Sequence, residues 1–196
     1  MKFLFDLGGV FFDWDPNYFF KNIFDKDDER KYFLTEVCND EWNIQQDAGR
    51  TIKEAESVLI PKFPQYEKEI KMYYSNHRRM IKGTFNSSIE VLDKLKKQNY
   101  ECYVLSNWSA ETFVGMTDDY PFLQLFDGLL ISGEDKLMKP DAAIYELAIS
   151  RFNLIAQETI FIDDKLENIE AAKNLHLKTI HLVDPNKIEY EIDKFI

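Results

Sequence analysis

The segment FLFDLGGV, residues 3–10, is an apolar run that reaches a single carboxylate, Asp6, and soon after it two glycines, Gly8 and Gly9. Parallel strands of an open α/β sheet bind ligands beyond their carboxyl ends. Glycines after such a strand let the chain bend sharply beside its last side chain. The segment therefore predicts a strand that presents Asp6 as a candidate nucleophile.

Four later runs have the same apolar character, at residues 100–106, 126–132, 159–163 and 177–183. They are rich in β-branched and aromatic residues and lack clean alternation, which suits strands buried on both faces of a parallel sheet. Helical patterns lie between them, at residues 87–98, 141–152 and 165–175. Strand alternating with helix predicts an α/β fold with a doubly wound, Rossmann-like parallel sheet.

Residues 15–82 have a different pattern, with helical periodicity at residues 16–24, 28–37, 52–60 and 66–80 and no strand candidate. Asp15 followed by Pro16 is typical of a helix start, with Asp15 as the N-cap. We therefore predict a helical cap domain, residues 15–82, inserted after the first strand of a core formed by residues 1–14 and 83–196. Such an insertion lies above the edge of the sheet where ligands bind.

Composition excludes several classes of partner. The formal net charge of -11 argues against binding to nucleic acid or to an anionic membrane surface. Two cysteines, Cys38 and Cys102, do not form a disulfide framework. Asp6 interrupts the apolar start and no cleavage site of a signal peptide follows. We expect a cytoplasmic protein with no membrane-spanning segment.

Polar side chains stand at the ends of the predicted strands. Separately, each has a plain interpretation as a helix cap, a turn residue or a solvated loop. Together at one sheet edge, three carboxylates beside one lysine would be costly unless an ion or ligand neutralised them. The residues are Asp6, Ser106, Asn107, Lys139, Asp163, Asp164 and, one helical turn further on, Asn168.

These residue types fit a phosphoryl-transfer site. Carboxylates such as Asp6, Asp163 and Asp164 supply oxygens to Mg²⁺, which prefers a few carboxylates together with phosphate and water. Ser106 can donate to a phosphate oxygen, and Lys139 is a compact positive charge for nucleophile and phosphate. Covalent catalysis through an aspartyl-phosphate is a known use of Asp.

The motifs FDLGGV, VLSN, KP and FIDDxxxN resemble, in order, the four motifs of the haloacid dehalogenase-like (HAD) hydrolase superfamily, across essentially the whole chain. The runs LSNWSAETF and SGEDKLMKPDAAIY are similar to those of its phosphatases with a small helical cap. The resemblance implies an Mg²⁺-dependent hydrolase. The roles it implies are Asp6 as nucleophile and metal ligand, the Gly8 carbonyl, Asp164 and Asp163 as further ligands, Ser106 and Asn107 as phosphate-binding residues, and Lys139 as the stabilising cation.

Gly8 departs from the resemblance. Most phosphatases and mutases of this superfamily carry, two residues after the nucleophile, an Asp that acts as general acid and base. General acid–base catalysis contributes about 10²–10⁴-fold of a total of roughly 10⁶-fold or more, so its loss weakens such a site without abolishing it. We therefore expect leaving groups that need little protonation, such as an anomeric sugar phosphate or an aryl phosphate. Asp13 and Asp15 are alternative proton donors.

Specificity candidates are fewer. Trp108, directly after Ser106 and Asn107, is predicted to contact the substrate. Residues 77–79 are interpreted as a solvated basic turn. In the predicted cap, four further residues are candidates for a contact with the substrate: Trp42, Gln46, Asp47 and Arg50. Amphipathic helical packing explains Trp42 about as well.

The sequence thus predicts an Mg²⁺-dependent phosphatase that acts on a small phosphorylated metabolite, with a sugar phosphate as the first expectation. Two alternatives stay open. A 2-haloacid dehalogenase also uses an Asp nucleophile and needs no proton for its leaving halide, but it needs no cation either. A non-catalytic binding or regulatory protein could keep the fold, with Gly8 as its support. Monomer and homodimer are both compatible with the sequence.

Overall fold

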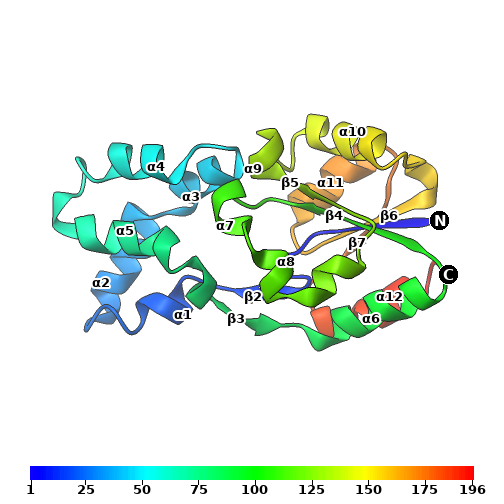
Figure 1. Cartoon of the computed structure of the whole chain (residues 1–196), viewed down its shortest axis with the longest axis horizontal. Helices are drawn as coiled ribbons and strands as arrows, with labels where there is room; N and C mark the ends of the chain where they lie inside the picture. The colour runs from blue at the N-terminus through cyan, green and yellow to red at the C-terminus, as the bar shows by residue number, and fades with distance from the viewer.

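The computed structural model describes all residues, 1–196, and contains a five-stranded parallel sheet. Figure 1 shows the sheet and its covering helices on one side of the molecule, and a second group of helices on the other. All five predicted apolar runs form strands of this sheet. In chain order these are β1 (Lys2–Phe5), β4 (Glu101–Ser106), β5 (Gly128–Ile131), β6 (Thr159–Asp163) and β7 (Lys178–His181).

The strand order is β5-β4-β1-β6-β7, so the first strand lies at the centre. Phe5 pairs with Val104 of β4 on one side and with Ile162 of β6 on the other. Because the strands are parallel and in this register, the residues that follow Phe5 and Ile162 leave the sheet at the same edge as Ser106. The topology therefore brings the predicted site residues together.

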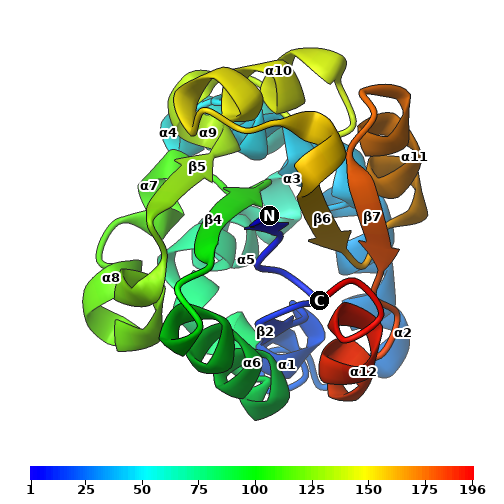
Figure 2. The same cartoon turned by 90° about the vertical axis from the view of Figure 1, so that its right-hand side faces the viewer.

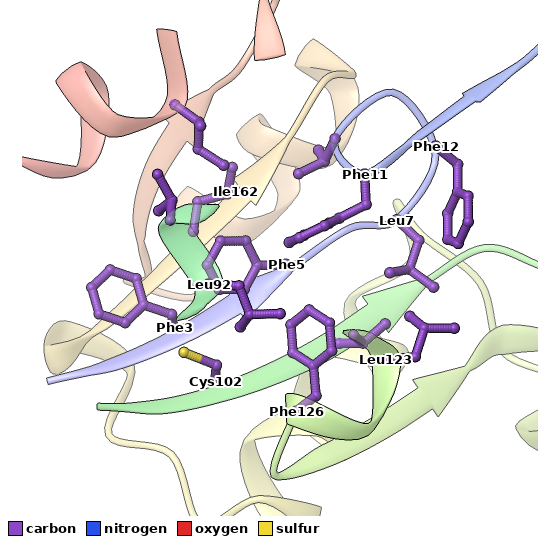
Figure 3. Close-up of a cluster of buried hydrophobic side chains, with 14 of the residues drawn as sticks. Phe3, Phe5, Leu7, Phe11, Phe12, Leu92, Cys102, Leu123, Phe126 and Ile162 are labelled. Carbon is purple, nitrogen blue, oxygen red and sulfur yellow. The ribbon is translucent and has the colours of Figure 1, made fainter. Parts of the chain in front are cut away.

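Helices cover both faces of the sheet, as Figure 2 shows. Phe3 and Phe5 point into a cluster of 24 buried residues that includes α6 (Asn86–Lys97) and α12 (Ile188–Ile192), part of which is drawn in Figure 3. Leu4 points to the opposite face, into a cluster with α10 (Ala142–Arg151) and α11 (Leu166–Asn174). Alternate residues of one strand are thus buried on opposite faces, which confirms the doubly wound prediction.

Three shorter helices lie beside the carboxyl edge of the sheet. α7 (Ala110–Phe113) and α8 (Met116–Asp119) follow β4, and α9 (Ser132–Asp135) follows β5 directly. α7 and α9 pack against each other. These helices lie in the segments that follow β4 and β5, and they therefore form one side of the candidate site.

The inserted helices form a group with its own hydrophobic cluster of 12 buried residues. Figure 1 shows this group as a separate lobe, while the boundaries at residues 15 and 82 stay a prediction. None of the helices of the molecule combines the length and apolar composition that crossing a membrane requires. The cap helices are α1 (Asn17–Phe20), α2 (Asp27–Tyr32), α3 (Asp40–Asp47), α4 (Ile52–Leu59) and α5 (Glu67–Ser75).

Three elements in or beside the insertion were not expected from the sequence. An antiparallel pair, β2 (Phe12–Trp14) and β3 (Ile81–Thr84), joins the sheet to the cap, and its strands are too short to show a period. Helix α3 has no apolar stripe, because only Trp42 and Ile44 are apolar in it. The helix is capped by Asn39, whose side chain accepts a hydrogen bond from the backbone N–H of Trp42 at 2.9 Å.

Candidate active site

Asp6 follows β1 and is held by two donors. Its Oδ1 accepts a hydrogen bond of 2.6 Å from the Ser106 hydroxyl and lies 3.0 Å from Nζ of Lys139. No protein donor bonds to Oδ2. The carboxylate is therefore fixed in orientation, with one oxygen left for chemistry.

Lys139 is buried between two carboxylates. Its Nζ donates to Oδ2 of Asp163 at 2.6 Å in addition to its contact with Asp6. Although burial acts against the charged ammonium, Asp163 and Asp6 raise the pKa of Lys139. Lys139 therefore remains a fixed cation at the centre of the site.

Asn107 holds the backbone of Lys139. The Asn107 side chain donates to the Lys139 carbonyl at 2.9 Å and accepts from the Lys139 backbone N–H at 2.9 Å. One N–H of this amide and its oxygen are thus engaged, so Asn107 positions Lys139. The predicted contact of Asn107 with phosphate stays a prediction.

Asp163 uses both of its carboxylate oxygens within the protein. Oδ1 accepts from the backbone N–H of Lys165 at 2.8 Å and from the Asn168 amide at 3.0 Å. Oδ2 accepts from Lys139 and, at 3.0 Å, from the same Asn168 amide. Asp163 is thus fully satisfied and orients Lys139 toward Asp6.

The acidic residues at this edge are crowded enough to suit a cation. Asp6, Asp163 and Asp164 each place one ligand atom within 4.8 Å of the others. Burial, and then the charges of Asp6 and Asp163, raise the pKa of Asp164 to about 6. Burial also raises the pKa of Asp6, although Lys139 opposes that rise. A divalent cation would relieve this repulsion, and oxygen-only donors suit Mg²⁺.

The loop after Asp6 leaves a further ligand available. Its backbone pairing runs from Phe12 N–H to the Leu7 carbonyl and from Gly9 N–H to the Phe12 carbonyl. The Gly8 carbonyl stands outside this pairing. The donor set of Asp6, Asp164 and the Gly8 carbonyl therefore fits a hard cation.

A cavity of about 520 Å³ opens above these residues, between the sheet edge and the cap. One of its walls is aromatic. Ring centroids are 5.6 Å apart for Phe12 and Trp108, 5.5 Å for Trp108 and His77, and 5.9 Å for His77 and Trp14. Trp108 thus lines the cavity as predicted from its place after Asn107, while its contact with a substrate stays a prediction.

The interpretation of residues 77–79 as a solvated turn is wrong for two of them. His77 lies between two indoles, and burial lowers its pKa to about 4. Arg78 donates to the carbonyls of Thr112 and Val114 at 2.5 and 2.6 Å, joining the cap to the core. Nothing local in the sequence indicates these contacts, because the partners lie more than thirty residues away.

Of the four cap candidates, only Asp47 lines the cavity. Trp42 and Gln46 are buried within the cap, and Arg50 donates to Oε1 of Gln46 at 2.6 Å and to the Trp42 carbonyl at 2.8 Å. Burial raises the pKa of Asp47 to about 7, and the charge of Asp6 adds to this rise. Packing therefore explains three of these residues and leaves Asp47 facing the site.

Comparison with known proteins gives the family. The model of the haloacid dehalogenase-like hydrolases matches residues 4–182, which include every site residue described above. The protein belongs to the haloacid dehalogenase-like hydrolase family. It is thus a HAD-family hydrolase, with the fold and the order of motifs that the resemblance implied.

Relatives of this HAD hydrolase include different enzymes. Sesquiterpene phosphatase astK of Aspergillus oryzae is 28% identical over 181 residues, which are 92% of this chain and 89% of that protein. (S)-2-haloacid dehalogenase 4A of Burkholderia cepacia is 26% identical over 110 residues, 56% of this chain and 48% of that protein.

A solved structure has the same fold. HAD family enzyme BT-2542 of Bacteroides thetaiotaomicron, in complex with magnesium and inorganic phosphate, superposes with a TM-score of 0.69 at 23% identity. The match covers 91% of this chain and 92% of that chain. At this identity the likeness establishes the fold.

Proposed function

We propose that this HAD hydrolase is an Mg²⁺-dependent phosphatase that hydrolyses small phosphate monoesters through an aspartyl-phosphate on Asp6. One observation carries the proposal: Asp6 stands between a buried Lys139 and a group of carboxylates that suits a cation. Asp6 provides the nucleophile and Lys139 a fixed positive charge beside it. A phosphatase at 28% identity over most of the chain and a structural neighbour that holds magnesium and phosphate support it.

The residues of the site divide the chemistry between them. In the first step, an oxygen of Asp6 bonds to phosphorus while the bond from phosphorus to the alcohol oxygen breaks and its electron pair stays on that oxygen. In the second, a water oxygen attacks the same phosphorus and the bond to Asp6 breaks to return the carboxylate, while the proton that this water loses balances the proton taken up by the leaving alcohol oxygen. Lys139 and Ser106 keep Asp6 oriented in both steps. When bound, Mg²⁺ held by Asp6, Asp164 and the Gly8 carbonyl would shield the phosphate charge from the nucleophile.

Asp163 has a supporting role in this proposal. The sequence places it with the metal ligands, but four protein hydrogen bonds already occupy its two oxygens. Its charge contributes to the acidic group, and its geometry holds Lys139. We assign it to positioning and leave direct ligation to Asp6 and Asp164.

The cavity walls indicate the organic part of the substrate. Phe12, Trp14 and Trp108 offer aromatic surface beside the phosphate position. Such a wall favours a monoester with an apolar face, such as a prenyl or aryl phosphate, or a sugar that presents its C–H face to a ring. The sesquiterpene phosphatase among the relatives favours the first of these.

The test is a panel of purified substrates with a matched variant. Prenyl, aryl and sugar phosphates would be assayed for released phosphate with Mg²⁺ and with chelator, in the wild type, Asp6→Asn and the exposed-residue control Asp118→Asn. We expect activity that needs Mg²⁺, persists in Asp118→Asn and is lost in Asp6→Asn. Phosphate release that survives Asp6→Asn would contradict the proposal.

The two alternatives have distinct signatures in the same experiment. Chloride release from a 2-haloacid in chelator, without phosphate release from any ester, would identify a dehalogenase. Failure to bind beryllium fluoride together with Mg²⁺ would favour a non-catalytic protein, because these ions mimic the aspartyl-phosphate at Asp6.

A further inference from the structure

The mechanism above leaves the leaving group without a proton donor. Gly8 has no side chain to provide one. In the wall of the cavity, His77 has a pKa lowered to about 4 by burial, so its imidazole is neutral at pH 7 and is a weak proton donor. The carboxyl groups that face the cavity are the remaining candidates.

The donors suggested by the sequence are engaged elsewhere. Asp13 accepts a hydrogen bond of 2.7 Å from the Tyr18 hydroxyl, and its other oxygen lies 3.7 Å from Nζ of Lys82. Asp15 accepts from both the backbone N–H and the side-chain amide of Asn17, at 2.8 and 2.9 Å. Helix α1 begins at Asn17, so Asp15 acts as its cap, one residue earlier than a standard N-cap.

Asp47 is placed differently. It is the last residue of α3 and lines the cavity, and no side chain of the molecule bonds to its carboxyl group, beside which lies the Ser109 backbone N–H. Unlike Asp40 and Glu167 of the same cavity, Asp47 is partly buried. The turn that follows it is docked on the core, because a Cβ at Gly49 would lie 2.6 Å from Lys136 and 3.2 Å from the Gly133 carbonyl. The end of α3 that carries Asp47 is therefore held against the core by a close contact between the two.

We propose that Asp47 is the general acid and base of this site and replaces, from the cap, the side chain that Gly8 lacks. As the bond between phosphorus and the alcohol oxygen breaks, Asp47 gives its proton to that oxygen. In the second step the Asp47 carboxylate takes a proton from the attacking water, which restores both Asp47 and Asp6. The assignment rests on the proposed phosphatase function.

The charge environment agrees with this role. A general acid works best with a pKa near the working pH, and burial raises the pKa of Asp47 to about 7. Lys165 and the Ser109 backbone N–H oppose the rise, and Asp6 adds to it. The other charged or titratable groups around the cavity are Asp13, Asp40, Tyr74, His77, Lys139, Asp164 and Glu167.

Asp47 also changes an expectation drawn from the sequence. Without a donor, the site would depend steeply on leaving-group acidity. With Asp47 protonated, alkyl phosphates, whose alcohols are poor leaving groups, become substrates as well. The dependence on leaving-group acidity therefore measures what Asp47 does.

The experiment compares Asp47→Asn with Glu41→Gln, an exposed residue of the same helix outside the cavity, on 4-nitrophenyl phosphate and on an alkyl phosphate. We expect Asp47→Asn to lower kcat/KM by about 10²–10³-fold on the alkyl ester and by less than about tenfold on the nitrophenyl ester. It should also remove the fall of kcat/KM above pH 7. Glu41→Gln should match the wild type.

A second variant provides rescue. A Cβ at Gly8 would meet no atom within 4 Å, so Gly8→Asp can be accommodated and places a carboxyl group at the usual position of the family. In the Asp47→Asn background, Gly8→Asp should raise kcat/KM on the alkyl ester by at least about tenfold. Equal losses on both esters, or an unchanged pH profile, would overturn the assignment of Asp47 alone. A wild type inactive on every ester would overturn it together with the phosphatase function.

Discussion

Gly9 lies so close to Asp164 that a Cβ atom at Gly9 would come within 2.5 Å of both Cγ and Oδ2 of the Asp164 side chain. Gly9 also has a φ of +68°, in the left-handed region that side chains disfavour. The loop after β1 and the loop after β6 therefore fit together only because position 9 has no side chain. A metal ligand proposed at Asp164 depends on this contact.

The two adjacent glycines should respond differently to alanine. Gly9→Ala is expected to cost about 1–2 kcal/mol from its backbone conformation, and to displace Asp164 and weaken Mg²⁺ dependence. Gly8→Ala should change the free energy of unfolding by less than about 1 kcal/mol, because its Cβ meets no neighbour. Urea unfolding and the Mg²⁺ concentration for half-maximal activity measure both effects. Equal behaviour of the two variants would contradict the Gly9–Asp164 contact.

Lys139→Met should show how much charge balance the buried lysine provides. Asp6 would lose its cation, so its pKa, already raised by burial, would rise further. We expect the free energy of unfolding to fall by about 3–5 kcal/mol at pH 8. A raised folded-state pKa gives stability that is lost as pH rises through it, so the loss should shrink toward pH 4. Urea unfolding in chelator across this range is the measurement, and a loss independent of pH would contradict the reasoning.

Asp47 should make the wild type less stable than Asp47→Asn above neutral pH. The pKa of Asp47 is raised by burial to about 7 in the folded protein, against an ordinary value of 3.8. The difference in the free energy of unfolding between the two proteins should be near zero below pH 4 and grow between pH 4 and 7. Above pH 7 it should level off at about 2 kcal/mol, after allowance for solvent in the cavity. Unfolding in chelator tests this without any substrate. A constant difference would indicate that Asp47 titrates normally.

Arg78 should control how firmly the cap is docked. It donates to two core carbonyls and pairs with Asp119 at 2.9 Å, whereas the neighbouring Arg79 is exposed and contacts only cap residues. Arg78→Ala is expected to cost roughly 1–2 kcal/mol and to raise amide exchange in α3 and α5. Arg79→Ala is the matched control. If both variants exchange alike, Arg78 does not hold the cap closed.

Much of the fold was readable because its signals are local. Each of the five predicted strands carries its own apolar run, and Asp6, Ser106 and Asp163 lie at the end of their strands or directly after it. The parallel order then places Asp6, Ser106 and Asp163 at one edge, whatever the rest of the chain does. The two short strands β2 and β3 and helix α3 carry no such period and were missed.

The site residues divide in the same way. The motifs around Asp6, Ser106, Lys139 and Asp164 identify a family by themselves, since each motif is a short run of neighbouring residues after or at the end of a strand. The contacts of Asn107 with the Lys139 backbone, and of Asp163 with Lys139 and Asn168, join loops that are separate in the chain. Position alone therefore suggests phosphate and metal binding for Asn107 and Asp163, while the contacts show that they hold Lys139.

The sequence by itself determined the α/β class, the family and the candidate nucleophile, because periodicity and motif spacing are properties of neighbouring residues. Only the tertiary structure decided which of the four cap candidates lines the cavity above Asp6. These four candidates lie close together in the chain: Trp42, Gln46, Asp47 and Arg50. Within the cap, Trp42 and Gln46 are buried and Arg50 is hydrogen-bonded to Gln46. Asp47 reaches the cavity because the turn at Gly49 docks on the core, a contact between segments more than eighty residues apart.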